Sequence, residues 1–202
     1  MTDTKIKFCS LRREEDVRFA SSLDADFMGF ILSERFKRYI KPEEVGQLKQ
    51  LVPAKTKTVG VFVDEPADYV TACARTARLD MIQLHGKEDD GYIVEIKEKT
   101  GLPVIKMIKP VTEDDIITAR KSSADLILLD SGAGGTGKVF DWSLAKDLGR
   151  DYILAGGLTP YNAADAVKRL KPFAVDVSSG VETEGIKDFE KMKAFASEVR
   201  KI

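Results

Sequence analysis

Cys9 is a side chain of this 202-residue chain whose type and place could do chemistry. It ends the β-type run Lys5–Cys9, and Lys7, two residues earlier, falls on the same face of that strand. An ammonium group favours a neighbouring thiolate, so Cys9 is a candidate catalytic residue, although a free cysteine most often only packs. Cys73 lies among alanines in a helical stretch and fits the packing role.

Asp130 and His85 also end apolar runs. Asp130 closes Leu126–Asp130, where partial burial would favour the protonated form and so suit a general acid near neutral pH. The alternative is a carboxylate that caps nearby backbone N–H groups. His85 is the only histidine and follows a similar run, so it is either a substrate contact or a packed side chain.

Two glycine-bearing strand ends in the last quarter of the chain predict a phosphate-binding cup. Gly156 and Gly157 follow one apolar run, and Ser179 and Gly180 follow the next. Glycine lets backbone N–H groups approach an anion closely, and a helix N-terminus adds the positive end of its dipole. In a (β/α)₈ barrel, the loops after strands seven and eight frequently hold phosphate.

The loop after the second strand concentrates positive charge at Arg35, Lys37 and Arg38. Most charge clusters are solvated surface. At the carboxyl end of a strand, however, one guanidinium group could bind a substrate carboxylate through two parallel hydrogen bonds.

The segment Gly132–Lys138 matches parts of two nucleotide-binding patterns. A phosphate-binding P-loop needs Ser or Thr where Val139 stands, and a dinucleotide fingerprint should open a helix, which here is predicted only near Asp141. A loop that closes over a substrate is the better interpretation. A plain surface loop and, less favoured, dinucleotide binding are the alternatives.

Eight strand candidates alternate with amphipathic helical stretches, which predicts parallel pairing. The strands are expected at Lys5–Cys9, Asp26–Leu32, Thr58–Asp64, Met81–His85, Val104–Lys109, Leu126–Asp130, Tyr152–Ala155 and Phe173–Val177. An open doubly wound sheet would alternate in the same way. The polar residues at most strand ends, Asp176 among them, favour a single (β/α)₈ TIM barrel with an active site at its mouth.

Composition bounds the function further. The length predicts one catalytic domain over residues 1–202, and 32 basic against 33 acidic residues argue against nucleic-acid binding. Without a signal-like start or a long apolar run, we expect a cytoplasmic protein with no membrane span. Two cysteines without metal-type spacing predict no metal site. The sequence does not decide between a monomer and a homodimer.

Taken together, the motifs resemble the phosphoribosylanthranilate isomerase family over the whole chain. The matching segments, in chain order, are Lys7-Phe8-Cys9, Gly29-Phe30 with Ser33 and Lys37-Arg38-Tyr39-Ile40, Gly60-Val61-Phe62-Val63, Gln83-Leu84-His85-Gly86, Leu129-Asp130 with Gly134-Gly135-Thr136-Gly137-Lys138, Phe140-Asp141-Trp142, Gly156-Gly157-Leu158 and Val175-Asp176-Val177-Ser178-Ser179-Gly180-Val181-Glu182.

The resemblance implies an intramolecular oxidoreductase of tryptophan biosynthesis that needs no cofactor. It would convert N-(5-phosphoribosyl)anthranilate to 1-(2-carboxyphenylamino)-1-deoxyribulose 5-phosphate by an Amadori aldose-to-ketose rearrangement. By the same resemblance Asp130 is the general acid, Cys9 the general base, and Arg38 the contact of the anthranilate carboxylate. Asp176 is expected to contact the sugar or amine, and the cup to hold the phosphate.

One position departs from the family pattern. The family commonly has glycine after the cysteine, whereas this chain has Ser10 and, two positions later, Arg12. Ser10 could restrict the backbone or hydrogen-bond the thiolate, so a catalytically silent phosphosugar-binding protein stays a competing hypothesis. Another sugar-phosphate isomerase or epimerase on the same barrel is a second, but it gives no reason for the Arg38 loop.

Overall fold

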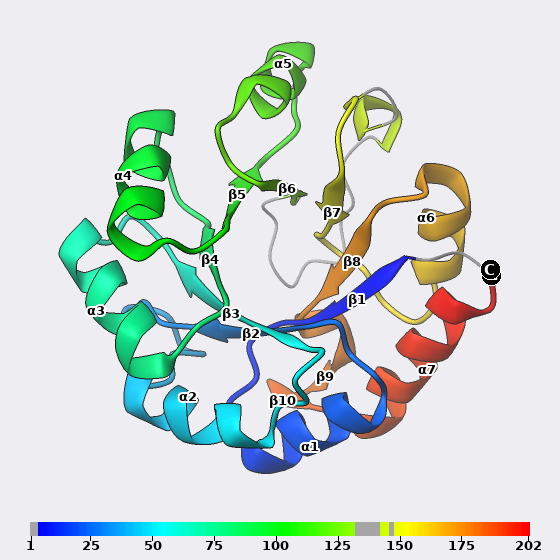
Figure 1. The fold of residues 1–202 in the computed structure, drawn as a ribbon. Coiled ribbons are helices and arrows are strands. Elements are labelled where there is room, and N and C mark those ends of the chain that lie inside the picture. Colours follow the sequence, from blue (N-terminus) through cyan, green and yellow to red (C-terminus); the bar gives the residue numbers. More distant parts are fainter. Residues whose placement is uncertain (1–3, 132–141, 146–147) are drawn as a thin grey trace.

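The computed structural model describes residues 4–131, 142–145 and 148–202, and their strands form a closed parallel barrel (Figure 1). Because β1 pairs with both β2 and β8, the barrel is confirmed and an open sheet is excluded. The strands are β1 Lys5–Phe8, β2 Phe27–Ile31, β3 Lys57–Phe62, β4 Met81–Leu84, β5 Val104–Ile108, β6 Leu126–Leu129, β7 Tyr152–Leu154 and β8 Ala174–Val177.

Helices form the outer ring of the molecule (Figure 1). The α-helices are α1 Glu14–Ser22, α2 Pro42–Leu48, α3 Ala67–Ala77, α4 Asp90–Thr100, α5 Glu113–Lys121, α6 Ala163–Leu170 and α7 Phe189–Arg200. Side-chain caps mark the starts of α5 and α7: Thr112 accepts from the N–H of Asp115, and Asp188 from that of Lys191. Short 3₁₀ turns are η1 Lys49–Leu51, η2 Trp142–Ala145 and η3 Ser179–Val181.

The segment between β6 and β7 differs from the expected helix. After β6, the described residues form only the 3₁₀ turn η2. The helix start expected at Asp141 and the glycine segment Gly132–Lys138 lie outside the described residues.

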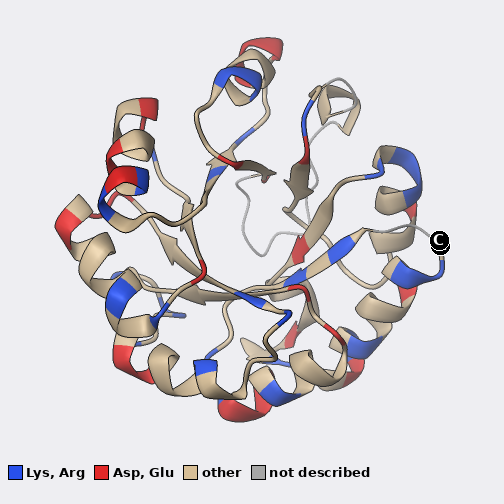
Figure 2. Cartoon of the chain, viewed as in Figure 1, with Lys and Arg blue, Asp and Glu red and all other residues tan. Residues whose placement is uncertain are grey.

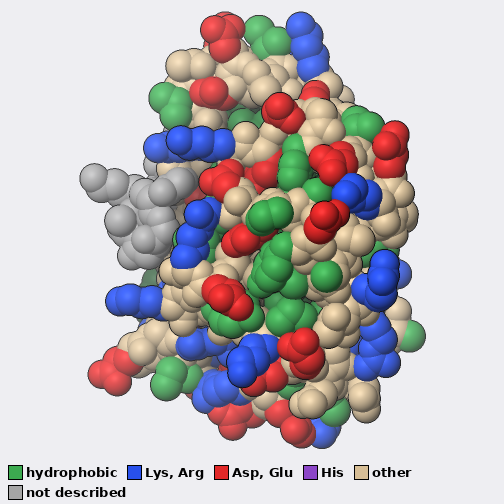
Figure 3. Space-filling model, turned by 90° about the vertical axis from the view of Figure 1, so that its left-hand side faces the viewer, with side chains coloured by type: hydrophobic (Ala, Val, Ile, Leu, Met, Phe, Trp, Pro, Cys, Tyr) green, Lys and Arg blue, Asp and Glu red, His purple; other side chains and the backbone are tan. Residues whose placement is uncertain are grey.

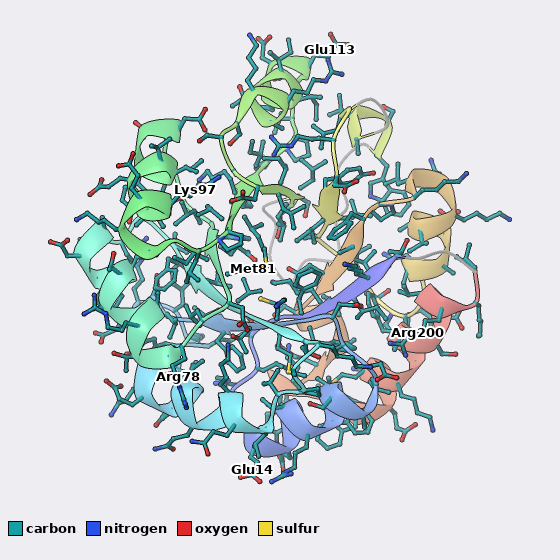
Figure 4. All side chains as sticks on the ribbon, in the orientation of Figure 1. Glu14, Arg78, Met81, Lys97, Glu113 and Arg200 are labelled. Carbon is teal, nitrogen blue, oxygen red and sulfur yellow. The ribbon has the colours of Figure 1, made fainter. Side chains whose placement is uncertain are left out.

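The apolar side chains form two cores. The larger lies between the strands and the helices and contains Cys73 of α3, as expected for a packed thiol. The smaller fills the barrel with a layer of strand side chains that includes Met81, which Figure 4 places inside the ring of strands. Its other buried members are Phe27, Val59, Ile105, Leu128, Ile153, Ala155 and Ala174. Glu14 and Arg200 lie on the outer ring in the same view.

Polar side chains replace this apolar layer towards the carboxyl ends of the strands. Because successive residues of a strand alternate faces, Lys7, Gln83 and Asp176 point into the barrel one step beyond the apolar layer, and all three are buried. The outer ring instead carries charges of both signs (Figure 2), and the face turned to the viewer in Figure 3 mixes acidic, basic and apolar side chains. Buried charge is thus placed at the mouth, where a barrel enzyme does its chemistry.

A small hairpin that the sequence did not predict follows β8. Strands β9 Glu182–Thr183 and β10 Ile186–Lys187 pair antiparallel, with Lys187 opposite Glu182. The two residues between them, Glu184 and Gly185, have φ values of 53° and 78°, the backbone pattern of a type I′ turn. No helix in the described part of the chain is both long and apolar enough to cross a bilayer.

Candidate active site

A buried ion pair forms the floor of the mouth. Lys7 of β1 donates to Asp176 of β8 over 2.9 Å, and the Lys7 side chain is 0% exposed. The two residues are direct partners in the β1–β8 register, so both side chains enter the barrel at one level. Burial lowers the pKa of Lys7, but Asp176 and Cys9 together raise it above its usual value. Asp176 therefore holds Lys7 charged.

Cys9 lies directly above this pair, one residue beyond β1, and is 6% exposed. A Cβ built on Gly29 of β2 would lie 2.7 Å from its Sγ and 3.1 Å from Lys7 Nζ, so thiol and ammonium are neighbours, as predicted. The net effect on the thiol is the reverse of the expected one. Burial raises the pKa of Cys9 and the charge of Asp176 raises it further, and together they outweigh the charges of Lys7 and Lys187, which lower it.

Asp130 and His85 meet on the other side of the mouth. Asp130 follows β6, three strands from β1 around the barrel, and its Oδ2 lies 3.8 Å from His85 Nε2. The amide nitrogen of Gln83 lies 2.8 Å from His85 Nδ1, so these two side chains share a face, as alternation along β4 requires. Because an amide nitrogen can only donate, Nδ1 accepts and the proton of the neutral ring sits on Nε2, towards Asp130. Burial, together with the charges of Lys7 and Lys106, lowers the pKa of His85 by more than Asp130 and Asp176 raise it, which keeps the ring neutral.

Gly156 makes room for Asp130. A Cβ on Gly156 would lie 2.9 Å from Asp130 Oδ1 and 2.5 Å from the backbone nitrogen of Ser131, and its φ of 82° is one that glycine tolerates best. The glycine predicted only as part of the phosphate cup therefore also packs against the predicted acid.

The two loops of the predicted cup lie against each other. Gly180 is the middle residue of the turn η3, and a Cβ there would lie 1.8 Å from the carbonyl oxygen of Leu158. Asn162 holds the first loop in shape, since its side chain donates to the Gly157 carbonyl and accepts from Thr159 N–H. A hollow of about 510 Å³ adjoins the cup and is lined in part by Gly157, Ser179 and Gly180. The structure thus brings these predicted residues together.

Arg38 lies in the loop after β2 and is paired. Its Nη2 donates to Glu182 Oε2 over 2.6 Å, while 36% of its side chain remains exposed. The second oxygen of Glu182 accepts from the buried Lys187 over 2.8 Å. A guanidinium group has five N–H donors, so Arg38 keeps donors for a further anion.

Ser10, the departure from the family pattern, has a left-handed backbone with a φ of 61°. This conformation explains why glycine is the simplest residue here. The Ser10 hydroxyl accepts a 2.9 Å hydrogen bond from Ser178, so it is engaged with the β8 side of the mouth.

Three buried charged side chains near the mouth lay outside the sequence prediction: Lys187, Glu88 and Lys106. Glu88 accepts from the N–H groups of Asp64 and Gly86 and from Lys106, which also donates to the Gly86 carbonyl. These bonds hold the loop that follows His85. Only the hairpin turn at Glu184-Gly185 could have signalled the place of Lys187.

The arrangement provides a thiol beside a lysine, a carboxyl group beside a neutral imidazole, a guanidinium group and an anion cup at one barrel mouth. It suits proton transfer on a phosphorylated, negatively charged small molecule. Among the described residues there is no group of three or more His, Cys, Asp or Glu side chains that could hold a metal ion.

Comparisons with known proteins agree with this arrangement. A relative from Thermoanaerobacter sp. (strain X514), named N-(5′-phosphoribosyl)anthranilate isomerase, is 42% identical over 98% of this chain and 98% of its own length. The crystal structure of phosphoribosyl anthranilate isomerase from Thermotoga maritima matches with a TM-score of 0.89 and 36% identity, covering 98% of this chain and 100% of that one.

A second solved structure, of phosphoribosyl anthranilate isomerase in complex with reduced 1-(o-carboxyphenylamino)-1-deoxyribulose 5-phosphate, has a TM-score of 0.87 and 35% identity, with 98% and 100% of the two chains covered. Residues 6–198 match the family model for N-(5′-phosphoribosyl)anthranilate isomerase. The chain therefore belongs to the N-(5′-phosphoribosyl)anthranilate isomerase family.

Proposed function

We propose that this protein converts N-(5′-phosphoribosyl)anthranilate to 1-(2-carboxyphenylamino)-1-deoxyribulose 5-phosphate in tryptophan biosynthesis, with Asp130 as the general acid and Cys9 as the general base. In this rearrangement C1 of the ribose is reduced and C2 is oxidised within one molecule, so the reaction takes up no external electrons.

Asp130 performs the first step. Its carboxyl group gives a proton to the ribose ring oxygen, the bond from that oxygen to C1 breaks, and the nitrogen lone pair forms a protonated Schiff base at C1. The neutral His85, with its proton towards Asp130, stabilises the carboxylate left behind. Gly156 supports this assignment because it leaves the space in which the carboxyl group stands.

Cys9 performs the second step. Its thiolate removes the C2 proton, the C2 electron pair forms the C1–C2 double bond of an enolamine, and the iminium charge is neutralised. Tautomerisation then gives the ketone. Lys7 favours the thiolate, whereas burial disfavours it, so in the free protein the pKa of Cys9 lies above its ordinary value. Near neutral pH, Cys9 is therefore mostly the thiol, and the thiolate that acts as the base is the minor form. The higher basicity of this thiolate offsets its low population in part.

The two charged ends of the substrate fix its position between these groups. The cup residues Gly156, Gly157, Ser179 and Gly180 would bind the phosphate through backbone N–H groups. Arg38 would bind the anthranilate carboxylate with donors not used by Glu182, and Asp176 would face the sugar or amine from the floor of the mouth.

The observation that carries the proposal is the convergence of Cys9 and Asp130 at one mouth between a cationic loop and the cup. It is tested by following the loss of phosphoribosylanthranilate fluorescence with the purified protein. Cys9→Ala and Asp130→Ala should each lower kcat by about 10²-fold or more, whereas Cys73→Ala, which removes the packed thiol, should not. Undiminished turnover in either of the first two variants would reject that residue's role.

The competing hypotheses predict different results in the same assay. A silent phosphosugar-binding protein would bind the reduced product analogue but leave substrate fluorescence unchanged, and Ser10→Gly would then restore turnover. Another sugar-phosphate isomerase would bind the analogue no better than ribulose 5-phosphate, because it would have no use for Arg38.

A further inference from the structure

The hairpin after β8 places two opposite charges face to face in the interior. Glu182 and Lys187 are direct partners in the β9–β10 register, so their side chains leave the same face of the ribbon. The Lys187 side chain is 2% exposed. Its ammonium group donates to Glu182 Oε1 over 2.8 Å and to the Ser178 carbonyl over 3.0 Å. A lysine this deep needs such partners, because burial of an unpaired charge is costly.

Glu182 connects Lys187 to the cationic loop. One carboxylate oxygen binds Lys187 and the other binds Arg38. A second set of hydrogen bonds joins the hairpin to the Arg38 loop at the surface. Arg12 donates to the Gly185 carbonyl over 3.1 Å and to the Lys37 carbonyl over 3.4 Å. The hairpin and the Arg38 loop are therefore held together from both sides.

Lys187 also lies within electrostatic reach of the thiol. Cys9 interacts electrostatically with three buried charged groups, Lys7, Asp176 and Lys187. The carbonyl that accepts from Lys187 belongs to Ser178, whose hydroxyl binds Ser10, the residue next to Cys9. Since Asp176 offsets the charge of Lys7, Lys187 is a second source of positive potential. Burial lowers the pKa of Lys187, Glu182 and Cys9 raise it, and Arg38 lowers it.

We propose that Lys187 is a positioning residue that serves both ends of the reaction: it fixes Glu182, and through it Arg38, for the substrate carboxylate, and its charge stabilises the thiolate of Cys9. The inference rests on the proposed function for the roles of Arg38 and Cys9. Beyond that function, it assigns to the buried Lys187 a role in the reaction without contact with the substrate.

The electrostatic half is tested without turnover, in a Cys73→Ser background, by measuring the rate of Cys9 alkylation by iodoacetamide against pH. Lys187→Met should move the midpoint up by about one pH unit and slow alkylation below it by about tenfold. Lys187→Arg should restore the profile. Lys49→Met, which removes a half-buried lysine paired with Asp80, is the matched control and should leave it unchanged. A folded Lys187→Met protein with the wild-type profile would overturn the proposal.

The positioning half is tested with Glu182→Gln, which leaves the Lys187 side chain in place but removes the carboxylate that holds Arg38. KM for phosphoribosylanthranilate should rise by about tenfold, while the alkylation midpoint should not move up. This variant also carries the test if Lys187→Met does not fold, and an unchanged KM would refute the link to Arg38.

Failure of the proposed function would look different. Full turnover by Cys9→Ala would remove the base assignment and leave the alkylation profiles as they are. An unmoved profile in Lys187→Met beside an inactive Cys9→Ala would reject only the inference on Lys187.

Discussion

Gly29 of β2 lies beside Cys9, which directly follows β1, and there is no room for a side chain between them. A methyl group on Gly29 would lie 2.7 Å from Cys9 Sγ, closer than side-chain carbon atoms approach other atoms in folded proteins. The same methyl group would lie 3.1 Å from Lys7 Nζ. The absence of a side chain at Gly29 is thus what allows the thiol and the ammonium to stand side by side.

Gly29→Ala should therefore displace Cys9 or Lys7. We expect kcat to fall by about 10²-fold, as a shift of about 1 Å in a reacting group can cost, and the free energy of unfolding to fall by about 1–3 kcal/mol. Steady-state kinetics and urea unfolding measure the two effects. Gly91→Ala in α4 is the control, because a Cβ there meets only Asp89 at 3.4 Å. Equal activity in both variants would contradict the role given to Gly29.

Gly156→Ala tests the space reserved for Asp130. The variant combines a left-handed backbone, at a cost of about 1–2 kcal/mol, with a contact 2.9 Å from Asp130 Oδ1. Gly101→Ala has the same type of backbone strain, at a φ of 67°, but meets no atom within 4 Å. Both variants should lose stability in urea unfolding. Only Gly156→Ala should lose turnover, by about 10²-fold, and a similar loss in Gly101→Ala would mean that strain alone is responsible.

Much of the fold could be predicted from the sequence because its signals are local. Apolar runs of β-branched residues marked all eight barrel strands, and Pro42 and Thr112 lie at the starts of two helices. The ends of the elements were less certain: Cys9 and Asp130 fall just beyond their strands. The paired position of Lys7 and Asp176 depends on barrel closure, which joins residues 169 positions apart and leaves no local pattern.

The site was predicted as a set of residues but not as a set of contacts. Lys7 was expected to lower the pKa of Cys9, and it does, yet burial outweighs it because the thiol is almost closed off by the barrel. Arg38 was expected to contact a substrate carboxylate, and its hydrogen bond to Glu182 was not part of that expectation. The pKa of Cys9 and the pairing of Arg38 depend on how deeply each side chain is buried and on partners from distant parts of the chain. The residue spacing within one segment predicts neither.

Gly180→Ala should open the cup. The added methyl group would lie 1.8 Å from the Leu158 carbonyl oxygen, so the two loops would have to separate. KM should rise by about tenfold or more, and inorganic phosphate should become a weaker competitive inhibitor, while kcat falls less. Gly46→Ala is the matched control, since its Cβ would lie 2.8 Å from the Thr76 carbonyl between two outer helices. If Gly46→Ala raised KM as much, loss of packing and not the cup would explain the effect.

Glu182 should make stability depend on pH in a defined range. Burial raises its pKa, but hydrogen bonds from Arg38 and Lys187 lower it by more, so the folded value lies below the ordinary 4.5. A carboxyl group with a depressed folded pKa stabilises the protein fully above its unfolded pKa, and that contribution disappears as the pH falls through the folded value.

The free energy of unfolding of Glu182→Gln, from urea titrations between pH 7 and pH 3, should therefore lie furthest below wild type at neutral pH and approach it as the pH falls below the ordinary carboxyl value of 4.5. Glu14→Gln, at an exposed pair with Arg18, should stay within about 0.5 kcal/mol of wild type throughout. A gap for Glu182→Gln that stayed constant down to pH 3 would show that the side chain stabilises the hairpin by packing and not by its charge.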